Sequence, residues 1–172
     1  MKILITGQTG LAQALANVYA EHQVKCVSVS GGHDINKIDL WGVDFLDYDM
    51  VVNCAYDGRG QELVLEYFFE HWKYDKTKTI VTVGSKVITQ PRLELALDYE
   101  YWAYRQHKQS LQMMHDAMLA TARCSMKIVN PGPIDTAMIA HLNITKMPVA
   151  DLAERIKIMA ADPMIKRLDL WL

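Results

Sequence analysis

The chain has 172 residues, of which 51% are hydrophobic and 22% are charged, and its formal net charge is −2. This length and balance are ordinary for one globular domain with a buried core, so residues 1–172 are expected to form a single domain. Basic residues are scattered among acidic ones and form no concentrated basic face, which excludes a protein that binds nucleic acid mainly through its phosphates.

Neither a membrane segment nor a metal site is expected. No segment approaches the roughly 18 uninterrupted apolar residues of a membrane-spanning helix, and the first residues lead into an apolar strand rather than a targeting segment. Cys26, Cys54 and Cys124 lie in or beside apolar runs without regular spacing, which predicts reduced thiols in a cytoplasmic protein. The six histidines show no spacing typical of metal ligands.

Short apolar runs alternate along the chain with longer segments that carry a helical apolar stripe. In chain order, the predicted elements are a strand at 2–6, a helix at 11–22, strands at 26–30 and 50–54, a helix at 61–72, a strand at 79–83, a helix at 99–121, a strand at 126–129, a helix at 151–160 and a strand at 168–172. Residues 31–48 are less regular, with one short strand expected at 34–35. This alternation predicts an α/β fold with a doubly wound parallel sheet, right-handed crossovers and helices on both faces.

A glycine turn, Thr6-Gly7-Gln8-Thr9-Gly10, joins the first strand to the first helix. Glycines at such a turn let the backbone approach a phosphate, and the helix N-terminus offers unpaired N–H groups. The turn therefore suggests a seat for the pyrophosphate of a dinucleotide, although a tight strand-to-helix turn without a ligand has the same pattern. Ala12 or Gln13 stands where the usual fingerprint has a third glycine.

The strand at 50–54 ends with Asn53-Cys54-Ala55. Carboxyl ends of strands line the cofactor crevice of a doubly wound sheet, so this end is expected to face the crevice. Asn53 could brace the neighbouring strand there, or it could be an ordinary turn asparagine.

Three polar residues follow in an order that suits proton transfer. Ser85 ends a strand, and Tyr104 lies four residues before Lys108 within the predicted long helix. Residues four apart share one helix face, so the ammonium could lie near the phenol and lower its pKa toward neutrality. Tyr104 could then exchange a proton with a carbonyl or alcohol oxygen that Ser85 also contacts.

The same spacing recurs once, at Tyr74 and Lys78, in a polar stretch with no catalytic residue upstream. That second pair is interpreted as a solvated loop. The competing interpretation of Tyr104 and Lys108 is an exposed helix pair.

Taken together and in order, these motifs resemble those of the short-chain dehydrogenase/reductase family over nearly the whole chain. The motifs are Thr6-Gly7-x-x-Gly10, Asp34-Ile35, Asn53-Cys54-Ala55, Ser85, Tyr104-x-x-x-Lys108 and Pro131-Gly132-Pro133-Ile134-Asp135-Thr136. The resemblance implies a Rossmann-type sheet, NAD or NADP as cofactor, a small-molecule substrate, and assembly into a homodimer or homotetramer. The chain would be an unusually short member, with a truncated substrate region after Thr136.

The resemblance also implies roles for individual residues. Asp34 and Ile35 would contact the adenine, and Lys108 would bind the nicotinamide ribose. Ile134 would lie near the carboxamide, and Thr136 would contact the carboxamide or a phosphate. The candidate catalytic residues are Ser85, Tyr104 and Lys108, and the candidate cofactor-binding residues are Gly7, Gln8, Thr9, Gly10, Leu11, Ser30, Asp34, Ile35, Asn53, Ala55, Tyr104, Lys108, Pro131, Gly132, Ile134 and Thr136.

The choice between NAD and NADP stays open. An acid after the second strand would bind the adenosine ribose, whereas an arginine or lysine would pair with a 2′-phosphate. Ser30 occupies this place, and the missing acid slightly favours NADP, but no arginine lies nearby.

The leading functional hypothesis is an oxidoreductase that interconverts a carbonyl and an alcohol. The alternatives are a dinucleotide-binding sensor or assembly module without catalysis, and a reductase or epimerase of nucleotide sugars. The last of these classes needs a sizeable C-terminal substrate domain, for which this chain leaves little room.

Overall fold

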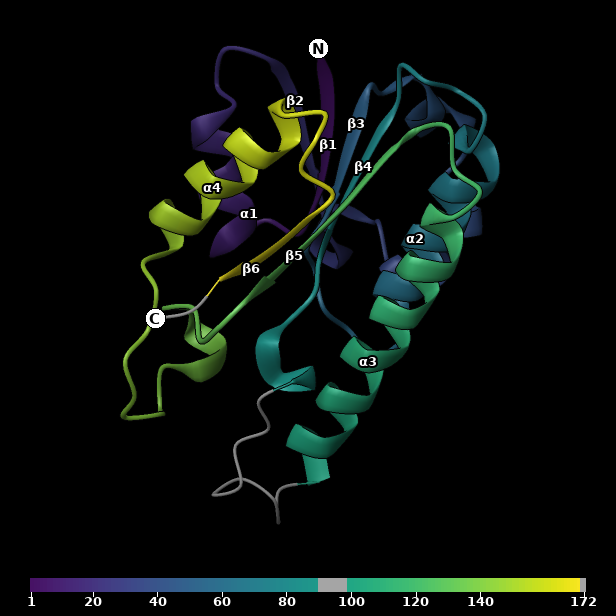
Figure 1. The fold of residues 1–172 in the computed structure, drawn as a ribbon. Coiled ribbons are helices and arrows are strands. Elements are labelled where there is room, and N and C mark those ends of the chain that lie inside the picture. Colours follow the sequence, from purple (N-terminus) through teal and green to yellow (C-terminus); the bar gives the residue numbers. More distant parts are fainter. Residues whose placement is uncertain (90–98, 171–172) are drawn as a thin grey trace.

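The computed structural model describes residues 1–89 and 99–170, and in this part of the chain six strands form one parallel sheet in the order β2-β1-β3-β4-β5-β6 (Figure 1). The strands are β1 (Lys2–Thr6), β2 (Gln23–Val27), β3 (Met50–Asn53), β4 (Thr79–Val83), β5 (Ser125–Pro131) and β6 (Arg167–Leu170). The helices are α1 (Leu11–Val18), α2 (Gly60–Trp72), α3 (Tyr99–Leu119) and α4 (Val149–Ala161). Short 3-10 helices occupy Val29–Gly31, Ile35–Leu40, Val43–Asp47, Lys86–Ile88 and Ala137–Ile139.

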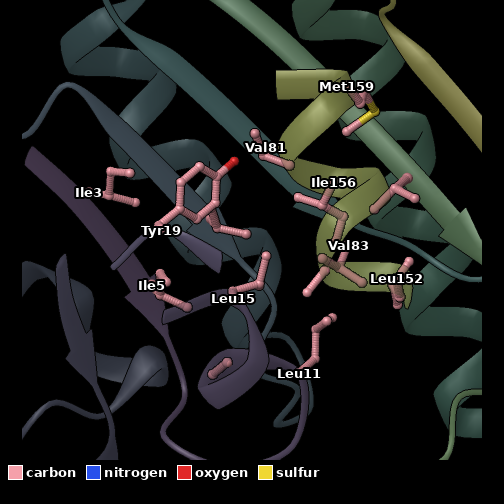
Figure 2. Close-up of a cluster of buried hydrophobic side chains, with 14 of the residues drawn as sticks. Ile3, Ile5, Leu11, Leu15, Tyr19, Val81, Val83, Leu152, Ile156 and Met159 are labelled. Carbon is pink, nitrogen blue, oxygen red and sulfur yellow. The ribbon is translucent and has the colours of Figure 1, made fainter. Parts of the chain in front are cut away.

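Helices cover both faces of the sheet, which confirms the predicted doubly wound architecture. Helices α1 and α4 lie together on one face, and α2 and α3 lie on the other (Figure 1). Figure 2 shows the core on the first face, where the labelled side chains come from β1, β4, α4, α1 and the residue that follows α1: Ile3, Ile5, Leu11, Leu15, Tyr19, Val81, Val83, Leu152, Ile156 and Met159. The core on the second face joins the sheet to α2, α3 and the irregular segment after β2.

The inner strands β1, β3 and β4 are mostly apolar on both faces because each face is covered. β1 and β4 coincide with the predicted ranges, and β3 ends one residue earlier than predicted. The edge strand β2 differs: it spans Gln23–Val27 rather than 26–30. Its exposed side chains, Gln23 and Lys25, interrupt the apolar pattern because an edge strand can face water.

Two other predicted elements are corrected. Helix α1 ends at Val18 rather than at residue 22, because the chain turns after Tyr19 to enter β2 beside β1. The strand predicted at 34–35 is wrong. The carboxylate of Asp34 accepts a 2.9 Å hydrogen bond from the backbone N–H of Asn36 and caps the 3-10 helix that begins at Ile35. Such a local bond favours a helical turn over an extended strand.

A buried lysine ties the sheet to the end of α4. Lys127 of β5 is 1% exposed, and its ammonium donates hydrogen bonds of 2.5 Å to the carbonyl of Asp162 and 2.9 Å to that of Ile165. Carbonyls at a helix C-terminus lack partners within the helix and carry partial negative charge. The ammonium therefore fixes the chain between α4 and β6.

The order of the strands places a crevice at the carboxyl ends of the strands, between β1 and β3. The chain runs from β1 outward to β2, then returns across β1 to β3, so the connections after β1 and β3 leave the sheet on opposite faces. In open α/β sheets, ligands bind outside the carboxyl ends of the strands at such a reversal.

Candidate active site

The glycine turn after β1 brings the backbone close to α1. Gly7 has a φ of 103° and Gly10 a φ of 55°, which other residues rarely adopt. A Cβ atom on Gly7 would lie 3.2 Å from the Cβ of Ala12. Ala12 is buried and Gln13 is exposed, so Ala12 provides the close helix–sheet contact. No side chain caps the N-terminus of α1 at Gly10.

A cavity of about 340 Å³ lies at the reversal of the sheet. Three segments line it: the glycine turn, the chain after β2, and the chain after β3. Its lining residues are Gly7, Gln8, Thr9, Val27, Ser28, Val29, Ser30, His33, Ile35, Ala55, Tyr56 and Asp57. Six predicted cofactor residues therefore share one cavity: Gly7, Gln8, Thr9, Ser30, Ile35 and Ala55.

Hydroxyl and amide groups form the rim of this cavity after β2. Ser30 donates a 3.0 Å hydrogen bond to the side-chain oxygen of Gln8, and the hydroxyls of Ser28 and Ser30 are 2.9 Å apart. Asp57 is the one carboxylate among the lining residues, and it accepts a 2.9 Å bond from the amide of Asn36. No lining residue is an arginine or a lysine, so the structure leaves the cofactor choice where the sequence left it.

The ends of β1 and β3 are joined by the side chain of Thr6, the first residue of the glycine-turn motif. The hydroxyl of Thr6 accepts 2.9 Å bonds from the backbone N–H groups of Cys54 and Ala55. Asn53 instead points to the helix side, where its amide donates a 2.7 Å bond to the carbonyl of Gln61. Thr6 thus braces the neighbouring strand, while Asn53 anchors the first turn of α2.

The side chains of Ser85 and Tyr104 lie close together. Ser85 is the second residue after the end of β4, and its side chain forms a hydrogen bond with Tyr104 of α3. Its hydroxyl also accepts a 3.3 Å bond from the backbone N–H of Val87, which fixes the turn after the strand. The two hydroxyl groups come from elements separated by the segment 90–98, which lies outside the described residues.

Lys108 lies beside Tyr104 but directs its ammonium inward. Its Nζ donates hydrogen bonds of 2.5 Å to Oε1 of Gln61 and 2.9 Å to the carbonyl of Val83. The same atom is 5.5 Å from the centre of the Tyr104 ring. Burial lowers the pKa of the Lys108 amine to about 7.

The expectation that Lys108 lowers the pKa of Tyr104 is wrong in this structure. Burial raises the pKa of the Tyr104 phenol to about 12, although the hydrogen bond with Ser85 acts in the opposite direction. The phenols of Tyr56 and Tyr101 raise it further. Tyr104 is therefore a neutral phenol at neutral pH.

A second tyrosine, Tyr56, lies between the cavity and Tyr104. Tyr56 lines the cavity, and its ring packs edge-on against that of Tyr104 with centroids 4.8 Å apart. Its hydroxyl lies 3.1 Å from Nδ1 of His107, which directly precedes Lys108. Neither Tyr56 nor His107 belongs to a motif. The signal available in the sequence is that Tyr56 directly follows Asn53-Cys54-Ala55.

The segment after β5 reaches over the glycine turn. The backbone N–H of Gly132 donates a 3.1 Å bond to the carbonyl of Leu170, and Ile134 forms a bridge with Met147. A Cβ atom on Gly10 would lie 3.5 Å from the methyl group of Thr136. Thr136 is therefore next to Gly10 at the N-terminus of α1, although the two residues are far apart in the sequence.

The remaining predicted residues lie away from the cavity lining. Leu11 packs into the core on the α1 face, and Asp34 lines a neighbouring hollow of about 320 Å³ with His33 and Trp41. Pro131 is buried at the end of β5. The other Tyr-x-x-x-Lys pair is separate from the site, with Tyr74 72% exposed in the turn after α2.

Residues 1–89 and 99–170 contain no group of three or more His, Cys, Asp or Glu side chains placed to hold a metal ion. Within the same ranges, every helix is too short or too polar to cross a membrane.

Comparison with known proteins supports the assignment of the fold. No family model matches the sequence, and no curated protein matches it. Among solved structures, a short-chain dehydrogenase from Burkholderia cenocepacia in complex with NADP has a TM-score of 0.79 at 16% identity, over 99% of this chain and 88% of that chain. A 3-alpha-hydroxysteroid dehydrogenase from Pseudomonas complexed with NADH has a TM-score of 0.72 at 17% identity, over 99% and 95%.

A short-chain dehydrogenase/reductase from Vibrio parahaemolyticus gives a TM-score of 0.69 at 16% identity, over 98% of both chains. The chain is therefore an α/β protein of the Rossmann type. More specifically, it has the fold of the short-chain dehydrogenases/reductases, which confirms the resemblance at the level of the fold.

Proposed function

We propose that the chain is an NAD(P)-dependent oxidoreductase of the short-chain dehydrogenase/reductase family that interconverts a carbonyl and an alcohol on a small substrate. The observation that carries this proposal is the meeting of Ser85, Tyr104 and Lys108 beside a cavity at the reversal of the sheet. The fold supports the class of cofactor, and the three side chains support the reaction.

The residues around the cavity fit the adenosine and pyrophosphate part of a dinucleotide. Gly7 lines the cavity without a side chain, and a Cβ at this position would crowd Ala12. The N-terminus of α1 supplies donors for a phosphate, and Ile35 supplies an apolar wall. When bound, a nicotinamide cofactor supplies the hydride that the protein lacks.

Tyr104 would hold the proton of the reaction. Its phenol is protonated at neutral pH because burial raises its pKa, which suits donation to a nascent alkoxide. Ser85 hydrogen-bonds the phenol, and its hydroxyl would also orient the substrate oxygen that receives the proton. The protonated phenol is the form that carbonyl reduction requires, and the reverse reaction would return the proton to the same oxygen. Nζ of Lys108 lies 5.5 Å from the centre of the Tyr104 ring.

The first test is a fluorescence titration with NADH and NADPH, followed by a panel of carbonyl and alcohol substrates read by the absorbance of the reduced nicotinamide. A Tyr104→Phe variant should retain cofactor affinity and lose turnover by about 100-fold or more, because a positioned proton donor contributes roughly that factor. Tyr74→Phe is the matched control, since it alters the exposed tyrosine of the other Tyr-x-x-x-Lys pair. Equal turnover of Tyr104→Phe and the parent protein would remove Tyr104 from the mechanism.

A non-catalytic dinucleotide-binding module is the second candidate. It is favoured by Lys108, which bonds inward to Gln61 and Val83, and by the Tyr56 ring that covers one side of Tyr104. This function predicts binding of NADH or NADPH together with no Tyr104-dependent turnover across the panel.

A further inference from the structure

Gln61 of α2 is built into the interior as the partner of Lys108. The glutamine is 2% exposed and the lysine 3% exposed. Oε1 of Gln61 accepts the 2.5 Å hydrogen bond from Nζ of Lys108, although the two residues are 47 positions apart in the sequence. Burial of a polar pair is costly unless each group is satisfied, so this contact needs the rest of its network.

That network fixes which end of the Gln61 amide faces the lysine. Nε2 of Gln61 donates bonds of 3.0 Å to the carbonyl of Asn53 and 3.2 Å to that of Val83. The amide of Asn53 donates a bond back to the carbonyl of Gln61. Rotating the Gln61 amide would place N–H groups against the ammonium and oxygen against two carbonyls, so Oε1 must point to Lys108.

Among residues 1–89 and 99–170, few other polar groups lie near the ammonium. The ionisable groups of these ranges that face it are the Cys54 thiol after β3 and the phenols of Tyr56 and Tyr104. Burial raises the pKa of all three, so they are neutral at neutral pH. Gln61 and the Val83 carbonyl thus provide the acceptors, and they use two of the three N–H groups of the ammonium.

We propose that Gln61 is a positioning residue, whose amide oxygen holds the ammonium of Lys108 beside Tyr104 and leaves one N–H for a ligand. This inference rests on the proposed oxidoreductase function, because the ligand would be the bound cofactor or substrate. Gln61 acts only through Lys108 and does not touch the reacting atoms.

Two variants separate this role from a general contribution to folding. Gln61→Glu and Gln61→Met both lose the donor that bonds the Asn53 and Val83 carbonyls, but only the glutamate keeps an acceptor for Lys108. The measurement is the NMR titration of isotope-labelled lysine side chains, with the Lys108 signal identified by its loss in Lys108→Met. Gln109→Glu, which adds a carboxylate at an exposed site on α3, is the control.

The titration midpoint of Lys108 should rise in Gln61→Glu, because a carboxylate at the place of Oε1 adds a negative charge beside the ammonium. The midpoint should fall in Gln61→Met, because this variant loses the acceptor that favours the charged amine. Gln109→Glu should leave the midpoint near that of the parent protein. Shifts of the same sign in both Gln61 variants, or no shift in Gln61→Glu, would overturn the proposal. If Gln61→Met does not fold, the rise or constancy of the midpoint in Gln61→Glu decides alone.

Cofactor titrations then separate this inference from the proposed function. Gln61→Met should weaken binding of NADH or NADPH by about tenfold, and more than Gln61→Glu, because a misplaced charged donor loses most of its bond to a ligand. A parent protein that binds neither dinucleotide would refute the proposed function, while the lysine titration would still decide whether Gln61 positions Lys108. The two Gln61 variants could show opposite midpoint shifts and still bind the cofactor with equal affinity. That result would contradict the part of the proposal in which Lys108 keeps one N–H for a ligand.

Discussion

Replacing Lys108 by methionine should change how the stability of the protein depends on pH. The substitution keeps a long unbranched side chain and removes the ammonium, which is 3% exposed. Burial lowers the pKa of this amine from its ordinary value of 10.5 to about 7 in the folded protein. Between these two pH values, the unfolded chain binds more protons than the folded one, so the free energy of unfolding rises with pH.

The size of this effect follows from the same pKa values. Below about pH 7 the amine is protonated in both states and its contribution is constant. From about pH 7 to about pH 9 the unfolded chain binds up to one proton more than the folded protein. The free energy of unfolding then rises by about 1.4 kcal/mol for each pH unit, which gives about 2 kcal/mol over this range. The bonds to Gln61 and Val83 favour the charged amine, so this figure is an upper value.

The assay is urea unfolding of the parent and Lys108→Met proteins, followed by the fluorescence of the four tryptophans at several pH values. The comparison stops near pH 9 because the buried Cys54 thiol, with a pKa raised to about 12, lowers stability at higher pH. The parent should gain up to about 2 kcal/mol relative to the variant over this range. Parallel curves for the two proteins would refute the reasoning that burial controls this amine.

Two further predictions concern stability. Thr6→Val should lower the free energy of unfolding by about 1–3 kcal/mol, because it leaves two partly buried N–H groups without their acceptor. Thr82→Val, whose buried hydroxyl has no partner among the described residues, should be nearly neutral or stabilising, and equal losses in the two variants would contradict the argument. Gly60→Ala should cost about 1–3 kcal/mol in the same assay, because its Cβ would overlap Ile35, and the double variant with Ile35→Ala should lose less than the sum of the single changes.

The parts of the fold that the sequence predicts best are those covered on both faces. The runs of β1 and β4 are short, apolar and rich in β-branched residues, which is typical of strands buried on both faces. The sequence therefore predicts them as inner strands. The edge strand β2 was misplaced because Gln23 and Lys25 face water there and break the apolar run. Asp34 was misread as part of a strand because its bond to Asn36 depends on local geometry rather than on an apolar pattern.

The candidate site shows the same division. The order of the motifs places Ser85 at the end of one strand and Tyr104 in the next helix. The chain path of a doubly wound sheet then brings the two side chains close together. Helical spacing places Lys108 on the face of Tyr104, but it does not give the direction of the ammonium. That direction depends on Gln61, whose contact with Lys108 spans 47 positions and leaves no local pattern.

Lys127 gives the protein an internal chemical reporter. Its amine is enclosed between β5 and the end of α4, so an acylating reagent can reach it only when that part of the molecule opens. The rate at which Lys127 reacts, compared with exposed lysines of the same chain, therefore measures how often the structure around β5 and the end of α4 opens. This measurement does not require the substrate to be known.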